Sequence, residues 1–239
     1  MELSFTRFRL YNECPWKYKL AFIDGWQAPA TPASALGVCL HRALECFHRS
    51  AEADWPAMEA CFERQWPQSG FPHGAEEALW RRKGLRMLES YFENEKSRRT
   101  RIIGIEKEFA YPLGPRSIRG MVDRIDEHPD GRRELIDYKT SLESEPPAAE
   151  RLSANLQLRF YALGVRESLG FKPDLLSIHY LAAGESRTIP YDDSGEEELK
   201  AMILAAAERI EAGEFRPDTS FCPRCHYRRR CVFSAARED

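Results

Sequence analysis

The spacing of apolar residues changes abruptly near residue 100, and this change limits what the chain can fold into. Before it, apolar side chains recur every three or four residues, as at Leu36, Leu40 and Phe47, which is typical of helices that bury one face. After it, apolar residues alternate with others and are separated by turn residues, which predicts strands at 103–111, 118–122 and 133–140. A mainly helical segment is therefore followed by a strand meander.

Further elements are expected on either side of the meander. Before it, helices are predicted after a cap at Ser4 and ending ahead of Cys14, then from Ser34 onward, and around 58–66 and 79–92, with a loop at 25–33. After it, we expect a helix from about 149 to 168, a strand at 176–182, an edge strand at 187–191 and a helix from about 195 to 212. The fold class is α/β, a mixed sheet flanked by helices.

Composition bears on the compartment in which the chain works. The sequence contains no run of roughly 18 apolar residues, and its first residues lack the basic and then apolar layout of a signal peptide. We therefore expect a cytoplasmic protein with no membrane partner. In a reducing compartment, seven cysteines that partly cluster indicate metal or redox chemistry before disulfides.

Overall charge does not indicate a nucleic-acid-binding protein. The chain has 35 basic and 38 acidic residues, a net charge of -3, whereas proteins that bind phosphate backbones are more often basic. Any such surface has to be local, and an ordinary solvated face is an equally good interpretation of each basic patch. The candidates are Arg7, Arg9, Lys17, Lys19, Arg228, Arg229 and Arg230.

The third strand carries a carboxylate and an ammonium that can act together. Asp137 and Lys139 are two residues apart, so both leave the same face of the strand. Asp123, on the preceding strand, can add a second carboxylate if the hairpin register allows it. Converging carboxylates suit a hard divalent cation such as Mg²⁺ or Mn²⁺, and a lysine beside them suits phosphodiester hydrolysis. Taken alone, the Asp-x-Lys triplet is better interpreted as a surface ion pair.

Four segments, taken together in their order along the chain, strengthen the catalytic interpretation. They are Gly37–Glu45, Gly120–Asp126, Leu135–Thr140, and Gln157 with Tyr161 at helical spacing. Together they resemble the nuclease domain of the RecB and AddB family, within the PD-(D/E)XK nuclease superfamily, and the resemblance runs from Ser4 to Cys231. It implies a PD-(D/E)XK restriction-endonuclease-like core with a helical N-terminal insertion.

The resemblance also implies roles for individual residues. His41, Asp123 and Asp137 would bind the metal, and Lys139 would be the catalytic lysine. Gln157 and Tyr161 would line the site from a helix. Two other groups of acidic residues are set aside. Asp126 lies off the face used by Asp123, so we expect a structural pairing with Arg124 or a place in a turn. Glu106 and Glu108 are interpreted as half-exposed strand carboxylates.

The cysteines near the C-terminus form a second candidate site. Cys222, Cys225 and Cys231 are close enough in sequence for a short loop to wrap one metal centre. Their spacing fits zinc nearly as well as an iron-sulfur cluster, with His226 as a spare ligand. Cys14 resembles the distant N-terminal cysteine of iron-sulfur members of the family, found in AddB and CRISPR adaptation nucleases, which implies a 4Fe-4S cluster. The remaining cysteines, Cys39, Cys46 and Cys61, are interpreted as small core residues.

The sequence is thus predicted to form a single nuclease domain over 1–239. It would comprise a mainly helical part at 36–100, a nuclease core at 101–212, and the ends 1–24 and 213–233 joined by the iron-sulfur site. The expected function is that of a metal-dependent exonuclease on single-stranded or end-bearing DNA, in repair or recombination.

Two alternatives remain open at this point. One is a CRISPR-type adaptation nuclease, and the other is a non-catalytic DNA-binding subunit of a helicase-nuclease complex. The expected partner is DNA, with a separate helicase, repair or CRISPR subunit in addition. A helicase would be a separate polypeptide, because the sequence has no Gly-x-x-x-x-Gly-Lys loop for ATP hydrolysis.

Overall fold

The structure is a computed structural model that describes residues 1–71, 73–140, 148 and 151–236. It divides into two compact units. The terminal unit comprises Met1–Pro29, Ala110–Gly120 and Asp193–Asp239, and the central unit comprises Ala30–Phe109 and Met121–Asp192. The helix predicted at 195–212 lies in the terminal unit.

A six-stranded mixed sheet contains the strands of both units. Its order is β1-β3-β4-β5-β6, and β2 pairs with β3. The pairs β1·β3 and β4·β5 are parallel, whereas β3·β4 and β5·β6 are antiparallel. This confirms the predicted mixed sheet and the predicted meander. The strands are β1 (Glu2–Ser4), β2 (Arg101–Leu113), β3 (Arg116–Glu127), β4 (Arg133–Lys139), β5 (Leu175–Tyr180) and β6 (Glu185–Pro190).

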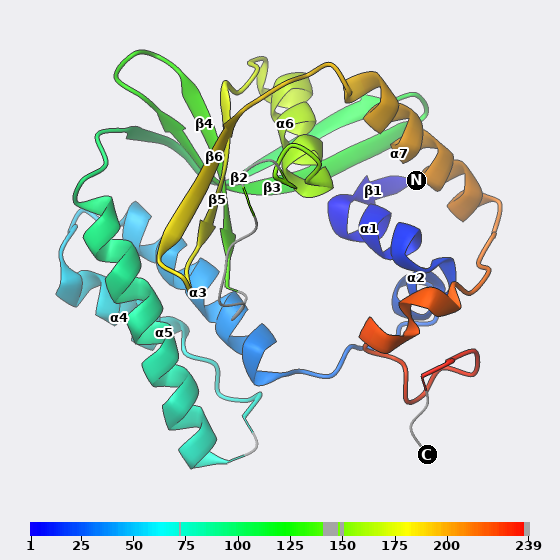
Figure 1. Cartoon of the computed structure of the whole chain (residues 1–239), viewed down its shortest axis with the longest axis horizontal. Coiled ribbons are helices and arrows are strands. Elements are labelled where there is room, and N and C mark those ends of the chain that lie inside the picture. Colours follow the sequence, from blue (N-terminus) through cyan, green and yellow to red (C-terminus); the bar gives the residue numbers. More distant parts are fainter. Residues whose placement is uncertain (72, 141–147, 149–150, 237–239) are drawn as a thin grey trace. The chain divides into compact units, whose positions relative to one another are not determined.

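Helices cover both faces of β4 in the central unit (Figure 1). Ile136 and Tyr138 belong to one apolar cluster with residues of three helices, α3 (Pro32–Arg49), α4 (Trp55–Gln65) and α5 (Gly74–Glu95). Because side chains alternate along a strand, Asp137 and Lys139 leave the opposite face, where they contact α6 (Leu156–Leu169). The polar pair is thus separated from the main apolar core by the sheet itself.

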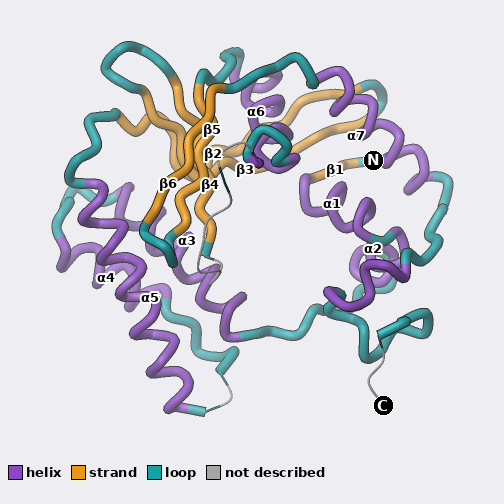
Figure 2. The backbone as a smooth tube through the Cα atoms, in the orientation of Figure 1, coloured by secondary structure: helices purple, strands orange, loops and turns teal. Residues whose placement is uncertain are grey.

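The two ends of the chain meet within the terminal unit, whose helices Figure 2 shows in purple. The Tyr11 hydroxyl donates to the carbonyl of Glu214 at 2.7 Å, and the Tyr227 hydroxyl donates to the carbonyl of Trp26 at 2.8 Å. The helices are α1 (Phe5–Glu13), α2 (Pro15–Phe22), α7 (Glu196–Glu211) and the short 3-10 helix η2 (Thr219–Arg224). Across both units, none of the helices in the described residues is long and apolar enough to cross a membrane.

Three elements differ from the sequence-based expectation. Strand β1 has only three residues, and α2 mixes apolar and basic residues without a clear period, so neither was predicted. The helix expected from residue 149 begins at Leu156, where the Asn155 side chain caps it by accepting from the backbone N–H groups of Gln157 and Leu158. Residues 149–150 of the predicted helix lie outside the described residues.

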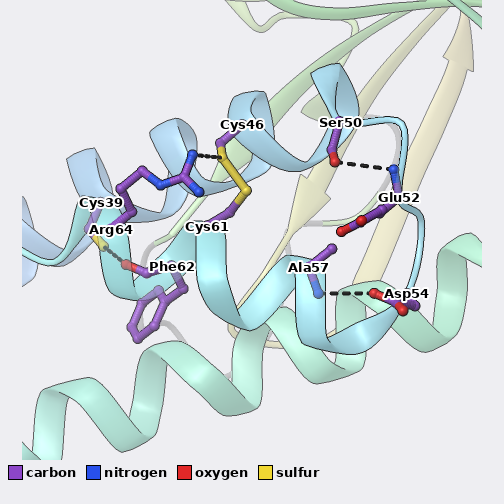
Figure 3. The surroundings of a disulfide bond; sticks show 9 residues. All are labelled: Cys39, Cys46, Ser50, Glu52, Asp54, Ala57, Cys61, Phe62 and Arg64. Atoms are coloured by element: carbon purple, nitrogen blue, oxygen red, sulfur yellow. Dashed lines mark hydrogen bonds between the residues drawn. A yellow bond between two sulfur atoms is a disulfide. The ribbon is translucent and has the colours of Figure 1, made fainter.

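A disulfide joins two helices of the central unit (Figure 3). Cys46 of α3 is bonded to Cys61 of α4, with their Cα atoms 5.8 Å apart. Both lie in or against the main apolar core, as predicted, but the bond between them was not predicted. Apolar neighbours on each helix indicate burial, but they do not indicate that the two thiols face one another. Cys39 is free and buried, and lies 3.8 Å from the carbonyl of Phe62, as expected of a small core residue.

Candidate active site

The β3–β4 hairpin brings the two predicted aspartates to adjoining strands. Arg124 pairs with Ile136 in the antiparallel register, so Asp123 and Asp137 take the next position along the ladder. Asp123 Oδ2 accepts the backbone N–H of Tyr138 at 2.7 Å, which holds this carboxylate across the hairpin. The hairpin register therefore brings Asp123 beside Asp137, which the sequence alone could not decide.

Gln157 connects the catalytic candidates of β4 to helix α6. Lys139 Nζ lies 2.6 Å from Asp137 Oδ2 and donates to Gln157 Oε1 at 2.7 Å. The amide nitrogen of Gln157 donates to Asp137 Oδ1 at 2.9 Å and to the Tyr161 hydroxyl at 3.1 Å. One amide therefore orients the carboxylate and the ammonium together, and the structure brings all four predicted residues into one network.

His41 reaches the same carboxylates from α3. Its Nδ1 lies 3.0 Å from the carbonyl of Gly37, and its Nε2 lies 3.3 Å from Asp123 Oδ2. Burial alone would lower the pKa of His41, but the hydrogen bond and the charge of Asp123 outweigh it and raise the pKa to about 9. Gly37 allows α3 this close to the end of β4, because a Cβ there would lie 3.0 Å from the Thr140 hydroxyl.

The carboxyl of Asp137 is incompletely satisfied. Its residue is 2% exposed, and burial raises its pKa, as does the charge of Asp123, against the opposing charge of Lys139. Its Oδ2 atom has Lys139 at 2.6 Å as its one polar partner among the described residues. A buried carboxylate in this condition costs free energy, and a cation that binds it would offset that cost.

Glu106 is a site residue that the sequence interpretation set aside. It lies on β2 with φ at +45°, a left-handed backbone conformation that is strained for a residue with a side chain. Burial and the charge of Asp123 raise the pKa of its carboxyl to about 7, while His41 opposes the rise. Glu106 and Glu108 share one face in the alternating pattern, so only the backbone conformation distinguishes them, and that cannot be read from sequence.

Asp126 belongs to a separate network, as predicted. Arg124 Nε donates to Asp126 Oδ1 at 2.6 Å, and the Thr100 hydroxyl donates to Oδ2 at 2.6 Å. Arg98 donates to the same Oδ2 at 2.8 Å. Burial would raise the pKa of Asp126, but these bonds and charges outweigh it and lower the pKa to about 2. The expected structural pairing of Asp126 with Arg124 is confirmed.

The terminal unit gathers the four predicted cysteines around a small apolar cavity of about 20 Å³. Cys14, Cys222, Cys225 and Cys231 are all buried and all free. The backbone N–H of Asp218 donates to Cys14 Sγ at 3.3 Å. Burial and the charges of two of the other cysteines raise the pKa of Cys225. His226, the predicted spare ligand, is exposed and does not line this cavity.

Both candidate metal sites have suitable donors, although neither is already arranged around an ion. In the described part of the chain, no three His, Cys, Asp or Glu side chains converge as ligands of one metal. The chemistry of the donors still fits: the carboxylates of Asp123 and Asp137 with the His41 imidazole suit Mg²⁺ or Mn²⁺, and four free thiols suit zinc or iron.

The structure changes the interpretation of the N-terminal basic patch. Lys17 is 4% exposed and lies 2.6 Å from Glu13, with its ammonium over the Phe221 ring. Lys19 lies 2.6 Å from Asp24. Lys17 in particular is a structural residue and does not contribute to a nucleic-acid surface. The C-terminal arginines differ, because Arg229 and Arg230 are exposed.

The chain is similar to known proteins in sequence and in fold. A family model described as the PD-(D/E)XK nuclease superfamily matches residues 2–232. No curated protein matches the sequence. Among solved structures, a Eubacterium rectale protein provisionally named an exonuclease is similar, with a TM-score of 0.55 and 15% identity over 91% of this chain and 84% of that chain. The structure of SSO0001 has 15% identity over 95% of each chain and a TM-score of 0.38.

Proposed function

Because this chain belongs to the PD-(D/E)XK nuclease superfamily, we propose that it is a metal-dependent deoxyribonuclease that cleaves single-stranded or end-bearing DNA as an exonuclease. The name of the Eubacterium rectale structure points in the same direction, although the likeness itself concerns the fold. Work on free ends also suits the expected role in repair or recombination. A resemblance to the RecB and AddB type is part of the same proposal.

One observation carries this proposal. The Asp137 carboxylate is buried beside Lys139, which at 2.6 Å is the one polar partner of its Oδ2 atom within the described residues. A structural ion pair gains stability when its remaining lone pairs are satisfied, whereas here the Oδ2 atom of Asp137 has Lys139 alone as a partner among the described residues and lies next to a second carboxylate, Asp123. Such an arrangement raises the free energy of the folded protein and suits a site that binds a cation and a phosphate.

Some of the site's side chains would bind the metal, and others would stabilise the negative charge of the phosphate. His41, Asp123 and Asp137 would hold Mg²⁺ or Mn²⁺, which when bound supplies positive charge to the phosphate that is cleaved. Lys139 brings a second positive charge, and Gln157 keeps its ammonium in place at 2.7 Å. Burial raises the pKa of Tyr161, so its hydroxyl keeps its proton, and it accepts a hydrogen bond from the Gln157 amide at 3.1 Å.

The test is cleavage of end-labelled linear DNA, single- and double-stranded, with Mg²⁺, with Mn²⁺ and with a chelator. We expect metal-dependent loss of linear strands, no loss in the chelator, and resistance of circular single-stranded DNA, which has no ends. Cleavage of circles would show an endonuclease instead. DNA binding without any cleavage would favour the non-catalytic subunit, and Asp137→Ala serves as the inactive control for contaminating nucleases.

The four thiols form a second part of the proposal. We infer that Cys14, Cys222, Cys225 and Cys231 bind one thiolate-ligated metal centre that joins the ends of the chain, a 4Fe-4S cluster on the family resemblance. The cavity that these cysteines line measures about 20 Å³, and because no three side chains of the described residues already converge as metal ligands, either zinc or a cluster requires the thiols to rearrange.

Metal analysis and visible absorption of anaerobically purified protein separate the two metals. A cluster predicts a coloured protein with iron and sulfide, and its colour is lost in each Cys→Ser variant of the four ligands. Cys39→Ser is the matched control, since Cys39 is also buried and free but lies in the central unit. A colourless protein with one zinc would overturn the cluster and leave the thiolate site standing.

A further inference from the structure

The terminal unit carries positive charge that its own carboxylates do not neutralise. Between residues 215 and 233 the sequence has five arginines and one acidic residue, Asp218, in a chain whose net charge is -3. None of the five forms an ion pair with a residue that the structure describes, whereas Arg116 and Arg209 of the same unit lie 2.7 Å and 3.2 Å from glutamates. The five are Arg216, Arg224, Arg228, Arg229 and Arg230.

The last of these arginines are held at the surface by buried neighbours. Cys225, Tyr227 and Cys231 belong to one apolar cluster, and the backbone N–H of Cys231 donates to the carbonyl of Tyr227 at 2.8 Å. Arg229 and Arg230 fall between these buried side chains and are exposed. The fold of the segment therefore presents both guanidiniums to solvent.

A structural role beside the thiols accounts for only one of the five arginines. Arg228 is half-buried and lines the cavity of the four cysteines, so it could compensate the charge of thiolates there. The other four arginines are exposed and do not line that cavity. Their charge is therefore available to an anion from outside the chain.

Aromatic and apolar side chains lie beside these charges. The Arg230 guanidinium lies 4.6 Å from the centre of the Trp26 ring, a contact that leaves its charge and its N–H edge available. Phe233 packs edge-on against Trp16, with ring centres 4.9 Å apart, yet is 45% exposed. Val232 beside it is 70% exposed. An apolar pair left in water next to cationic groups indicates a partner that is both anionic and apolar.

Single-stranded DNA has this combination of properties. Its phosphates form a regular row of negative charges that suit guanidiniums, and its unstacked bases offer flat faces to an exposed aromatic ring. In a duplex the base faces are already stacked on one another, so the ring of Phe233 would gain little from it. The charges and the exposed ring together favour a single strand.

We propose that Arg229, Arg230 and Phe233 bind single-stranded DNA, the two arginines through its phosphates and the ring through one base. This inference rests on the proposed DNA nuclease function, and it adds a binding surface in the terminal unit to the metal-binding site of the central unit. Because no residue of that metal-binding site belongs to the surface, DNA should bind to it in the absence of divalent metal.

The test measures the affinity of the full chain for a labelled oligodeoxythymidylate by fluorescence anisotropy, in a chelator, over a range of salt concentrations. The first variant combines Arg229→Ala with Arg230→Ala. Its matched control combines Arg82→Ala with Arg86→Ala, two exposed arginines of α5 that also lack an ion pair among the described residues.

A second arm separates stacking from charge. Phe233→Leu keeps an apolar side chain and removes the ring, and an abasic oligonucleotide of the same length keeps the phosphates and removes the bases. Since Phe233 lines the thiol cavity, the metal content of this variant is measured alongside. Vesicles of phosphatidylglycerol serve as an anionic and apolar surface without bases.

We expect the Arg229 and Arg230 double variant to bind oligodeoxythymidylate about 10-fold more weakly at low salt. The slope of log affinity against log salt should fall by roughly 1.4, about 0.7 for each lost phosphate contact on a single strand. Phe233→Leu should weaken binding of oligodeoxythymidylate about 5-fold or more and leave binding of the abasic strand unchanged. The Arg82 and Arg86 control should bind as wild type does.

Three results would overturn the inference. One is an equal loss of affinity in the control, which would show an effect of net charge alone. Another is equal binding of the abasic strand and of oligodeoxythymidylate by wild type, which would exclude the base contact. The third is binding of the vesicles without binding of DNA, which would make the surface a membrane contact.

Asp137→Ala keeps this inference apart from the nuclease proposal. Metal-free binding that depends on Arg229 and Arg230, in wild type and in Asp137→Ala, with no cleavage by wild type, would refute the nuclease and leave the surface. Metal-dependent cleavage by wild type, with DNA binding unchanged in the double variant, would do the reverse. If Phe233→Leu loses metal, the arginine variant still decides the outcome, because neither arginine lines the thiol cavity.

Discussion

Asp123 and Asp126 lie three residues apart on β3 but belong to networks of opposite character. Asp126 is 0% exposed, and its oxygens accept bonds from Arg124, Arg98 and Thr100. On the other face of the hairpin, Asp123 lies beside Asp137, whose buried Oδ2 atom has Lys139 alone as a polar partner among the described residues. An aspartate whose oxygens are fully hydrogen-bonded stabilises the fold, whereas an aspartate with few hydrogen-bond partners remains able to bind a ligand.

The pKa values express the same difference. Arg124 and its neighbours lower the pKa of Asp126 to about 2, so folding favours its ionised form. Burial raises the pKa of Asp137, so folding disfavours its ionised form unless a cation binds. Removing Asp126 should therefore reduce the stability of the fold, and removing Asp137 should reduce the cleavage activity.

The largest expected effect is on catalysis, in Asp137→Ala. We expect cleavage of linear DNA to fall on the order of 10³-fold or more, because the variant removes a metal-binding carboxylate. The melting temperature should stay the same or rise, since a buried and poorly satisfied charge is removed. Asp130→Ala, in the exposed turn of the same hairpin, is the control. Wild-type cleavage by Asp137→Ala would show that the site is misassigned.

The opposite result is expected for Asp126→Ala. The variant leaves Arg124 and Arg98 short of a buried counter-charge, and breaking such a pair costs about 3–5 kcal/mol in the free energy of unfolding. Urea denaturation followed by tryptophan fluorescence measures the loss. The cleavage rate per folded molecule should be retained, and an unchanged stability with lost cleavage would reverse our assignment of the two networks.

Lys139→Met sharpens the comparison within the catalytic site. An ammonium does not ligate a cation, so the variant should lower the single-turnover rate about 10²-fold, or about 3 kcal/mol, with metal and DNA binding retained. Metal affinity should rise slightly, because a like charge next to Asp137 is gone. Calorimetric metal titration of Lys139→Met and Asp137→Ala tests the split. Normal cleavage by Lys139→Met would reduce the pair to a structural ion pair.

The smallest effect concerns acid stability of the network on the Asp126 side. Burial, aided by Arg98 and Arg124, lowers the pKa of His179 to about 3. In the unfolded chain His179 takes up a proton below its ordinary pKa of about 6.5, whereas in the folded protein it stays neutral down to about pH 3. Between these two pH values the free energy of unfolding should fall by roughly 1.4 kcal/mol for each unit that the pH drops. Urea denaturation at several pH values should show a shallower fall for His179→Phe. An identical slope in both proteins would contradict the neutral buried state.

Periodicity predicted most of the fold because the pattern is strong where a face is buried. Alternation placed Asp137 and Lys139 on one face of β4, and helical spacing placed Gln157 beside Tyr161, as the structure shows. The roles of these residues remain predictions. Three features were not predicted: the Cys46–Cys61 bond, the strained backbone of Glu106, and helix α2, in which apolar and basic residues are mixed. None of these has a local signature in the sequence.

The Cys46–Cys61 bond determines how a sample of this protein has to be prepared. Thiols that are to bind a metal have to stay reduced, whereas the bond between α3 and α4 exists only in the oxidised chain. A dithiol reagent added to protect Cys14 would also open the bond on α3, the helix that carries His41. Two preparations made in different buffers would then contain two covalent forms of one sequence, and their cleavage rates could be compared only after the thiols of each had been counted.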